Sequence, residues 1–221
     1  MKVTDVKHKF IFLGQSVLRY EVPYDIFRVI NSIYETNFKN LPPANKQLVG
    51  KIKNEHSIFY NGDDETKMKK HSLIPLEIKQ WFMSMFEHYL LFNKVRNFKS
   101  HLNSIWVNEM RAHEYNPVHI HQGSLFTGLS SVMILKLPST YGVEYSAEGS
   151  PQNGKLQILG SSSGQFSNID YQPEIRERDF YIFPYDMRHT VYPFNGTNEV
   201  RRTLAANCDV HYNPVENRGV S

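Results

Sequence analysis

Cysteine is almost absent from this chain, which has one, Cys208, among 221 residues. A single thiol cannot form an internal disulfide, and it cannot build a zinc site out of several cysteines. The class of disulfide-stapled secreted domains and the class of cysteine zinc fingers are therefore excluded. A lone thiol is typical of a protein in a reducing compartment, so we expect a cytoplasmic location.

A strong charge and a long apolar run are also missing. The formal net charge is +3, and no basic run alternates with stacking aromatic residues, so nucleic acid is not an expected partner. No apolar segment reaches the length of a membrane span, and the first residues, Met1 to Asp5, do not begin a signal peptide. We therefore expect no membrane association, and the composition leaves the oligomeric state open.

The chain length favours one domain, in which we separate a helical part (residues 1–102) from a β-rich part (residues 103–212). Apolar residues spaced three and four apart predict two helices in the first part. The first helix follows Pro23 and carries Ile26, Ile30, Ile33 and Tyr34. The second begins near Pro75 and carries Ile78, Phe82, Met85, Phe86 and Tyr89. Residues 40–72 between them are polar and predict a long loop with room for a short helix.

The second part alternates short apolar segments with Gly, Pro, Asn and Ser, which predicts eight strands. The expected strands are Ser104–Met110, Val118–His121, Gly128–Leu137, Gly142–Ser146, Lys155–Leu159, Phe180–Phe183, Thr190–Tyr192 and Arg201–His211. Short strands without helices between them indicate a mainly β fold, a jelly roll or barrel rather than βαβ units.

Three of the ten histidines form a pattern that suits a metal ion. His119 and His121 alternate on a predicted strand, so their imidazoles would face the same side. His189 follows a Phe-Pro turn much later in the chain and could close a three-point cage that leaves positions for substrate and oxygen. The remaining histidines lack a spaced partner, and we interpret them as structural.

A basic pair on the last predicted strand offers an anion site. Arg201 and Thr203 would share one strand face, beside the small Ala205, whereas Arg202 would point to the opposite face. A guanidinium can bind a carboxylate through two parallel hydrogen bonds, and a nearby hydroxyl adds a donor. The plain alternative is an exposed charge on an edge strand, and Lys136 on a neighbouring strand is the second choice for an anion clamp.

Taken in chain order, these features resemble a family of 2-oxoglutarate/Fe(II) oxygenases akin to the prolyl 4-hydroxylases and found in bacteria and phages. The shared features are H-x-H at 119–121, a strand ending in Pro138, Phe183-Pro184 before His189, and R-x-T at 201–203 in a strand leading to Asn207. Trp106-Val107-Asn108 ahead of the H-x-H strengthens the resemblance, which covers about residues 104–208.

The resemblance implies a double-stranded β-helix (jelly roll) with supporting N-terminal α-helices. It implies that His119, His121 and His189 bind Fe(II), that 2-oxoglutarate is the cosubstrate, and that Arg201 with Thr203 holds its distal carboxylate. With O2, the implied reaction couples decarboxylation of 2-oxoglutarate to hydroxylation of a peptide or small-molecule substrate, whose identity the sequence leaves open.

One position departs from the wider superfamily, which has H-x-D or H-x-E. Here His121 stands in place of the carboxylate. Either three histidines bind the iron, or Glu114 or Asp186 supplies a carboxylate, or the barrel is inactive. With three imidazole ligands, we expect iron to be released as the pH falls toward about 6.

Two other readings stay open. A three-histidine metal protein of the cupin type also combines a β-barrel with H-x-H and a distant histidine, but cupins usually add a glutamate where this chain has Leu125, Phe126 and Thr127. That missing glutamate and the presence of Arg201 favour the oxygenase. The third reading is a non-catalytic jelly-roll binding module, which a failure to bind iron would favour.

Overall fold

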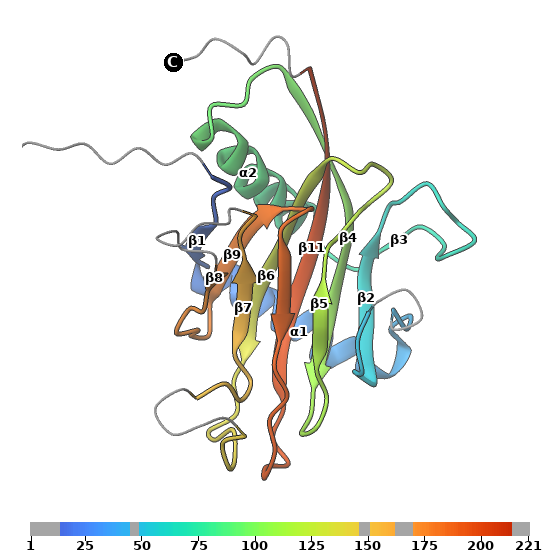
Figure 1. Cartoon of the computed structure of the whole chain (residues 1–221). Coiled ribbons are helices and arrows are strands. Elements are labelled where there is room, and N and C mark those ends of the chain that lie inside the picture. Colours follow the sequence, from blue (N-terminus) through green and yellow to red (C-terminus); the bar gives the residue numbers. More distant parts are fainter. Residues whose placement is uncertain (1–13, 45–48, 146–150, 162–169, 214–221) are drawn as a thin grey trace, which may run out of the picture.

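Two antiparallel sheets face each other in the computed structural model, which describes residues 14–44, 49–145, 151–161 and 170–213 (Figure 1). In spatial order, the seven-stranded sheet contains β1 (Leu18–Glu21), β9 (Asp179–Pro184), β6 (Gly128–Lys136), β11 (Arg201–Tyr212), β4 (Phe98–Met110), β2 (Asn54–Tyr60) and β3 (His71–Ser72). The four-stranded sheet contains β5 (Asn116–His119), β10 (Arg188–Val191), β7 (Leu156–Leu159) and β8 (Asp170–Tyr171). This is the predicted jelly roll.

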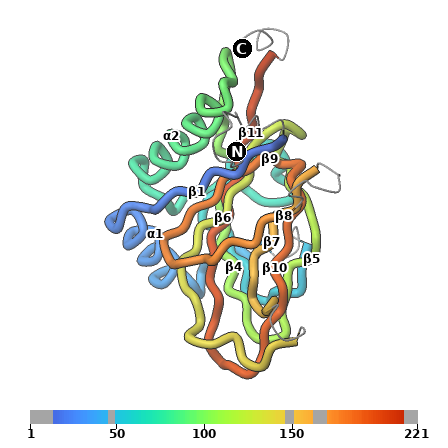
Figure 2. Tube along the Cα trace, turned by 60° about the vertical axis from the view of Figure 1, so that its left-hand side comes forward, coloured from blue at the N-terminus to red at the C-terminus, as the bar shows by residue number. Residues whose placement is uncertain are grey.

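Both predicted helices are present and cover the outer face of the seven-stranded sheet (Figure 2). Helix α1 (Tyr24–Asn37, followed by the 3-10 turn Phe38–Asn40) and helix α2 (Leu76–Phe92) each begin directly after a proline. Proline is tolerated there because the first amides of a helix have no intrahelical acceptor. The predicted apolar stripes are buried against the sheet, so the helices support it from outside.

The side chains of the last strand, β11, point alternately to the two faces of the seven-stranded sheet. Leu204, Ala206 and Cys208 join the core under the helices. Thr203 and Ala205 face the other way, into a cavity between the sheets. Since side chains alternate along a strand, Arg201 faces the space between the sheets and Arg202 faces the helices, as predicted.

The N-terminal part is not only helical, and the prediction of a long loop over residues 40–72 was wrong. Strands β1, β2 and β3 and the start of β4 all lie before residue 103. Strand β2 escaped the sequence pattern because most of it is buried while its cavity-facing residues, Glu55 and Ser57, are polar. An apolar alternation is therefore not visible there.

Two predicted strands differ from the structure. No strand forms over residues 142–145, since Gly142 takes a positive φ of 75° and turns the chain. Residue 146, the end of that predicted strand, lies outside the described residues. Strand β5 ends at His119, so His121 is not part of it. The other six predicted strands are present with shifted ends.

None of the helices in the described part of the chain is both long enough and apolar enough to span a membrane.

Candidate metal centre

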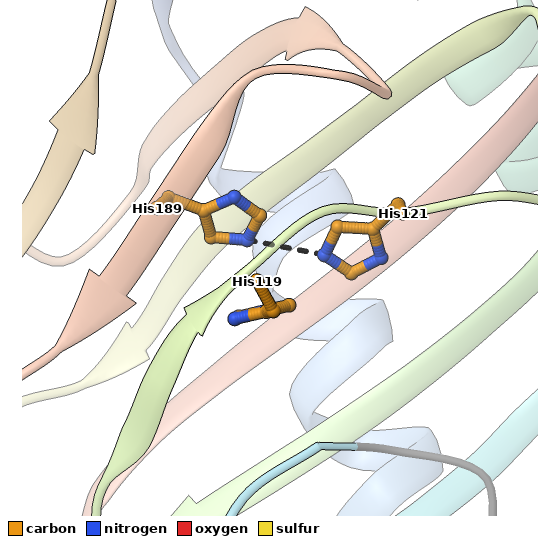
Figure 3. Close-up of side chains that lie close together, drawn as sticks. All are labelled: His119, His121 and His189. Atoms are coloured by element: carbon orange, nitrogen blue, oxygen red, sulfur yellow. Dashed lines mark hydrogen bonds between the residues drawn. The ribbon is translucent and has the colours of Figure 1, made fainter.

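Three histidines from two neighbouring segments converge where β5 ends and β10 begins in the four-stranded sheet (Figure 3). His119 on β5 and His189 on β10 are register partners across the two strands. His121 lies just past β5, where its backbone N–H donates to the Tyr185 carbonyl at 2.9 Å. One ligand atom from each of the three side chains lies within 4.8 Å of the other two. The structure therefore brings together the three residues that the sequence singled out.

Backbone carbonyls orient two of the rings. The His119 Nδ1–H donates to the Pro117 carbonyl at 2.7 Å, and the His189 Nδ1–H donates to the Met187 carbonyl at 3.1 Å. A carbonyl oxygen can only accept, so each bond places the proton on Nδ1 and leaves the Nε2 lone pair available. Metal-binding histidines are commonly fixed by this kind of outer contact.

The spacing of the nitrogens fits a divalent metal ion. His121 Nε2 and His189 Nε2 are 3.1 Å apart. Two nitrogens bound at about 2.1 Å to one ion and at right angles to each other would be about 3.0 Å apart. Imidazole is a common ligand for first-row divalent metals, iron included. The donor set and its spacing can therefore hold such an ion.

Neither carboxylate considered from the sequence joins this group within the described residues. Glu114 accepts hydrogen bonds from the backbone amides of Lys53 at 3.1 Å and Arg111 at 2.8 Å. Asp186 is exposed and accepts from the side chain of Gln15 at 2.8 Å. Both carboxylates are engaged elsewhere in this structure.

The histidines border a cavity of about 520 Å³ between the sheets. Its walls include Trp106, Val132, Thr203 and Ala205, and the Trp106 ring centroid lies 5.7 Å from that of His121. The volume is sufficient for a cosubstrate and a small part of a substrate.

Arg201 lies beyond Thr203 on the same strand face and does not itself line the cavity. The side chain is buried, and its Nε and Nη2 atoms have no hydrogen-bond partner in the described part of the chain. Burial lowers the pKa of this guanidinium, while the nearby Tyr141 hydroxyl acts in the opposite direction without being in hydrogen-bonding geometry. A buried cation with unused donors is costly alone and fits a carboxylate.

Arg202, in contrast, is fully engaged on the helix side. Its guanidinium binds Glu109 at 3.0 Å and Glu35 at 2.9 Å, and it lies 4.7 Å from the centre of the Tyr34 ring. Lys136, the second choice from the sequence, is exposed. Arg201 is thus the basic residue of the three whose position suits an internal anion.

Residues 104–207 match the family model described as "Putative 2OG-Fe(II) oxygenase". This segment belongs to the 2-oxoglutarate/Fe(II) oxygenases. It spans β4 to β11 and contains the three histidines, Arg201 and Thr203. The family resemblance inferred from the sequence is confirmed, and the family implies Fe(II) and 2-oxoglutarate as cofactor and cosubstrate.

Solved oxygenase structures share the fold at low sequence identity. A prolyl-4-hydroxylase from Pseudomonas putida is 13% identical, with a TM-score of 0.53 over 89% of this chain and 92% of that one. A prolyl hydroxylase from Trichoplax adhaerens, in complex with a peptide fragment of the hypoxia inducible factor, is 11% identical, with a TM-score of 0.51 over 94% and 87%. A comparison with curated proteins gives no match. The family match of residues 104–207 and the histidine cluster together support a non-haem iron oxygenase.

Sequence reasoning missed a residue that ties the two histidine segments together. The buried Asp209 on β11 accepts hydrogen bonds from the Ser124 backbone N–H at 3.0 Å and from the Tyr185 hydroxyl at 3.1 Å. Ser124 follows His121, and Tyr185 precedes His189. A Cβ at Gly123 would lie 2.0 Å from Asp209 Oδ1, so this contact needs glycine. Asp209 sits in no recognisable motif, which is why the sequence did not reveal it.

Burial lowers the pKa of all three histidines. The pKa of His189 falls to about 3, first because the ring is buried and then because His119 would repel its charge. The folded site thus keeps its imidazoles neutral below the unperturbed pKa of about 6.5, and those of His121 and His189 well below it. Protons therefore compete with iron at a lower pH than the value of about 6 expected from the sequence.

We expect the free energy of unfolding of the metal-free protein to decrease as the pH falls below about 6.5. Unfolded His189 binds a proton there, whereas folded His189 stays neutral down to a pKa of about 3. The unfolded state then binds more protons, and this residue contributes a slope of about 1.4 kcal/mol per pH unit between the two values. Urea unfolding at several pH values measures the slope, and the His189→Gln variant should show a shallower one. Equal slopes would contradict the assignment.

Proposed function

We propose that this protein is a 2-oxoglutarate-dependent iron dioxygenase in which His119, His121 and His189 hold Fe(II). Arg201, assisted by Thr203, would bind the distal carboxylate of 2-oxoglutarate, and decarboxylation to succinate would be coupled to hydroxylation of a C–H bond. The observation that carries the proposal is the histidine cluster at a cavity whose sheet wall leads to an unpaired, buried guanidinium.

The chain contributes position and charge to this reaction. Bound iron would supply the reactivity toward dioxygen, which no side chain of the protein can provide. The Pro117 and Met187 carbonyls orient two of the ligand rings. Arg201 would fix the far end of 2-oxoglutarate, so that its other end points toward the histidines. Trp106, Val132 and Ala205 supply apolar walls that limit the access of water.

The proposed site has no carboxylate ligand to offset the charge of the metal and of Arg201. Three neutral imidazoles leave the full positive charge on Fe(II), and the two carboxylates of 2-oxoglutarate offset it. The usual triad carries one negative charge more. We therefore expect this site to depend strongly on the cosubstrate for its charge balance.

The test is succinate formation by wild-type protein supplied with Fe(II), 2-oxoglutarate and O2, in the presence of candidate peptides and small molecules. We expect succinate to form with wild type and to fall to background in the His119→Ala, His189→Ala double variant. The same succinate yield from both proteins would contradict the proposal. Background levels in wild-type protein, with iron bound, would favour a non-catalytic module.

A further inference from the structure

Glu55 is a buried carboxyl group in the wall of the histidine-lined cavity. It lies on β2, before the segment that matches the oxygenase family, and its exposed fraction is 2%. Its Oε1 atom is buried without a hydrogen-bond partner, and no ion pair to it is found among the described residues. Within the described part of the chain, the cavity thus contains an acidic group without a cationic partner.

The surroundings of Glu55 leave its carboxyl group poorly solvated by water. Burial, and to a lesser degree the negative charge of Glu114, raises the pKa of Glu55 to about 7. Glu114 is held by backbone amides and offers Glu55 no donor. The following position on β2 points elsewhere, since the His56 ring packs against Tyr34 and Phe38 on the helix side. The geometry therefore directs Glu55 away from the helices and into the cavity.

Two further acceptor atoms line the same cavity. Glu55 is the register partner of Asn108, which is in turn the partner of Thr203, so the three share one level of the sheet. Asn108 Oδ1 and Asn116 Oδ1 are also buried, without partners among the residues that the structure describes, and both residues line the cavity. An amide can turn to present either a donor or an acceptor, whereas an ionised carboxylate only accepts. The negative charge of Glu55 therefore determines which kind of ligand suits this part of the cavity.

The charge of Glu55 separates two parts of the cavity. A dianion such as 2-oxoglutarate is attracted toward Arg201 and repelled by Glu55. The strands of the two residues, β11 and β2, are separated by β4. The space beside Glu55 suits a ligand that carries N–H donors and positive charge. Apolar groups adjoin it, because Ala44, Trp106 and Ala205 form a small cluster against which Met68 packs.

We propose that Glu55 binds a protonated primary amine of the substrate, so that the substrate class is an amine with a compact apolar body. An ammonium group has three N–H donors, and Glu55 and the amide oxygens of Asn108 and Asn116 offer acceptors in the same cavity. This assignment rests on the proposed function, because it is the oxygenase substrate that would bring the amine. Binding at Glu55 can nevertheless be measured without turnover.

The experiment compares isoamylamine with isoamyl alcohol, which have the same apolar body and differ in charge. Each probe is titrated by calorimetry or NMR into full-length protein, once without additions and once with Fe(II) and 2-oxoglutarate under anaerobic conditions. We expect wild type to prefer the amine by roughly 10- to 100-fold, the typical range of a charge-assisted hydrogen bond. The isosteric Glu55→Gln variant should lose this preference. Asp64→Asn is the matched control, since Asp64 lines the same cavity but is exposed and paired with Lys67 at 3.7 Å, and it should keep the preference.

Three outcomes would overturn the proposal. They are an equal preference for the amine in wild type and Glu55→Gln, no preference in wild type, and a weakened affinity of Glu55→Gln for Fe(II) or 2-oxoglutarate instead of for the amine. The titration without additions separates this test from the proposed function. If iron does not bind but the amine preference still depends on Glu55, the proposed function fails and the amine site stands.

Discussion

Replacing His189 with alanine is expected to abolish stoichiometric iron binding. His189 contributes one of three neutral donors, and its Nε2 lies 3.1 Å from that of His121. Removing an outer contact of a metal ligand already costs roughly 10- to 100-fold in affinity, so loss of the ligand itself should cost more than about 100-fold. Anaerobic titration with Fe(II) measures the change. His88→Ala is the matched control, because His88 lies exposed on α2 and bonds to Tyr20. Unchanged iron affinity in His189→Ala would remove the site from this place.

His121 is the position at which the chain departs from the usual triad, and two variants at this position sharpen the same titration. His121→Asp introduces the usual carboxylate and should keep or strengthen iron binding. His121→Ala should weaken it, because Glu114 and Asp186 are engaged elsewhere and cannot replace the lost ligand without rearrangement. If the alanine variant binds iron as tightly as wild type, His121 is not a ligand.

The second large effect is expected at Arg201. Its guanidinium is buried and lacks partners at Nε and Nη2 among the described residues, so a carboxylate would complete its hydrogen bonding. Losing this charge-assisted pair should weaken 2-oxoglutarate binding by about 1.5–3 kcal/mol, roughly 10- to 150-fold. Calorimetric titration of 2-oxoglutarate into the iron-loaded Arg201→Ala variant tests this expectation.

Arg202→Ala is the matched control and should change a different property. Arg202 forms a pair with the buried Glu109, and removal of one partner of such a pair typically costs about 3–5 kcal/mol in the free energy of unfolding. Its 2-oxoglutarate affinity should stay near that of wild type. If Arg202→Ala weakens 2-oxoglutarate binding more than Arg201→Ala does, Arg202 rather than Arg201 is the clamp.

The sequence allowed those residues of the proposed site to be placed that follow a local period. His119, Arg201 and Thr203 could be placed because alternation along a strand fixes which side chains share a face. His121 was expected on the same strand, but β5 ends at His119. The backbone bond to Tyr185 positions it instead, and no pattern within one strand predicts a contact between segments so far apart.

The acidic residues of the site could not be placed from the sequence. Glu55 lies on a strand whose polar residues face an internal cavity, and such a polar sequence is typical of a loop. Asp209 alternates with apolar residues near the end of a long strand, a pattern that predicts an exposed side chain. Its carboxylate instead joins the two histidine segments through hydrogen bonds. Both roles arise from long-range packing, and a period of two carries no information about it.

Anaerobic equilibrium titration of wild-type protein with Fe(II), with and without 2-oxoglutarate, tests the three-histidine iron site most directly. We predict one Fe(II) per chain, bound more tightly when 2-oxoglutarate is present, and no stoichiometric binding by the His119→Ala, His189→Ala double variant. The absence of stoichiometric iron binding in wild type, or the same stoichiometry in the double variant, would contradict the account.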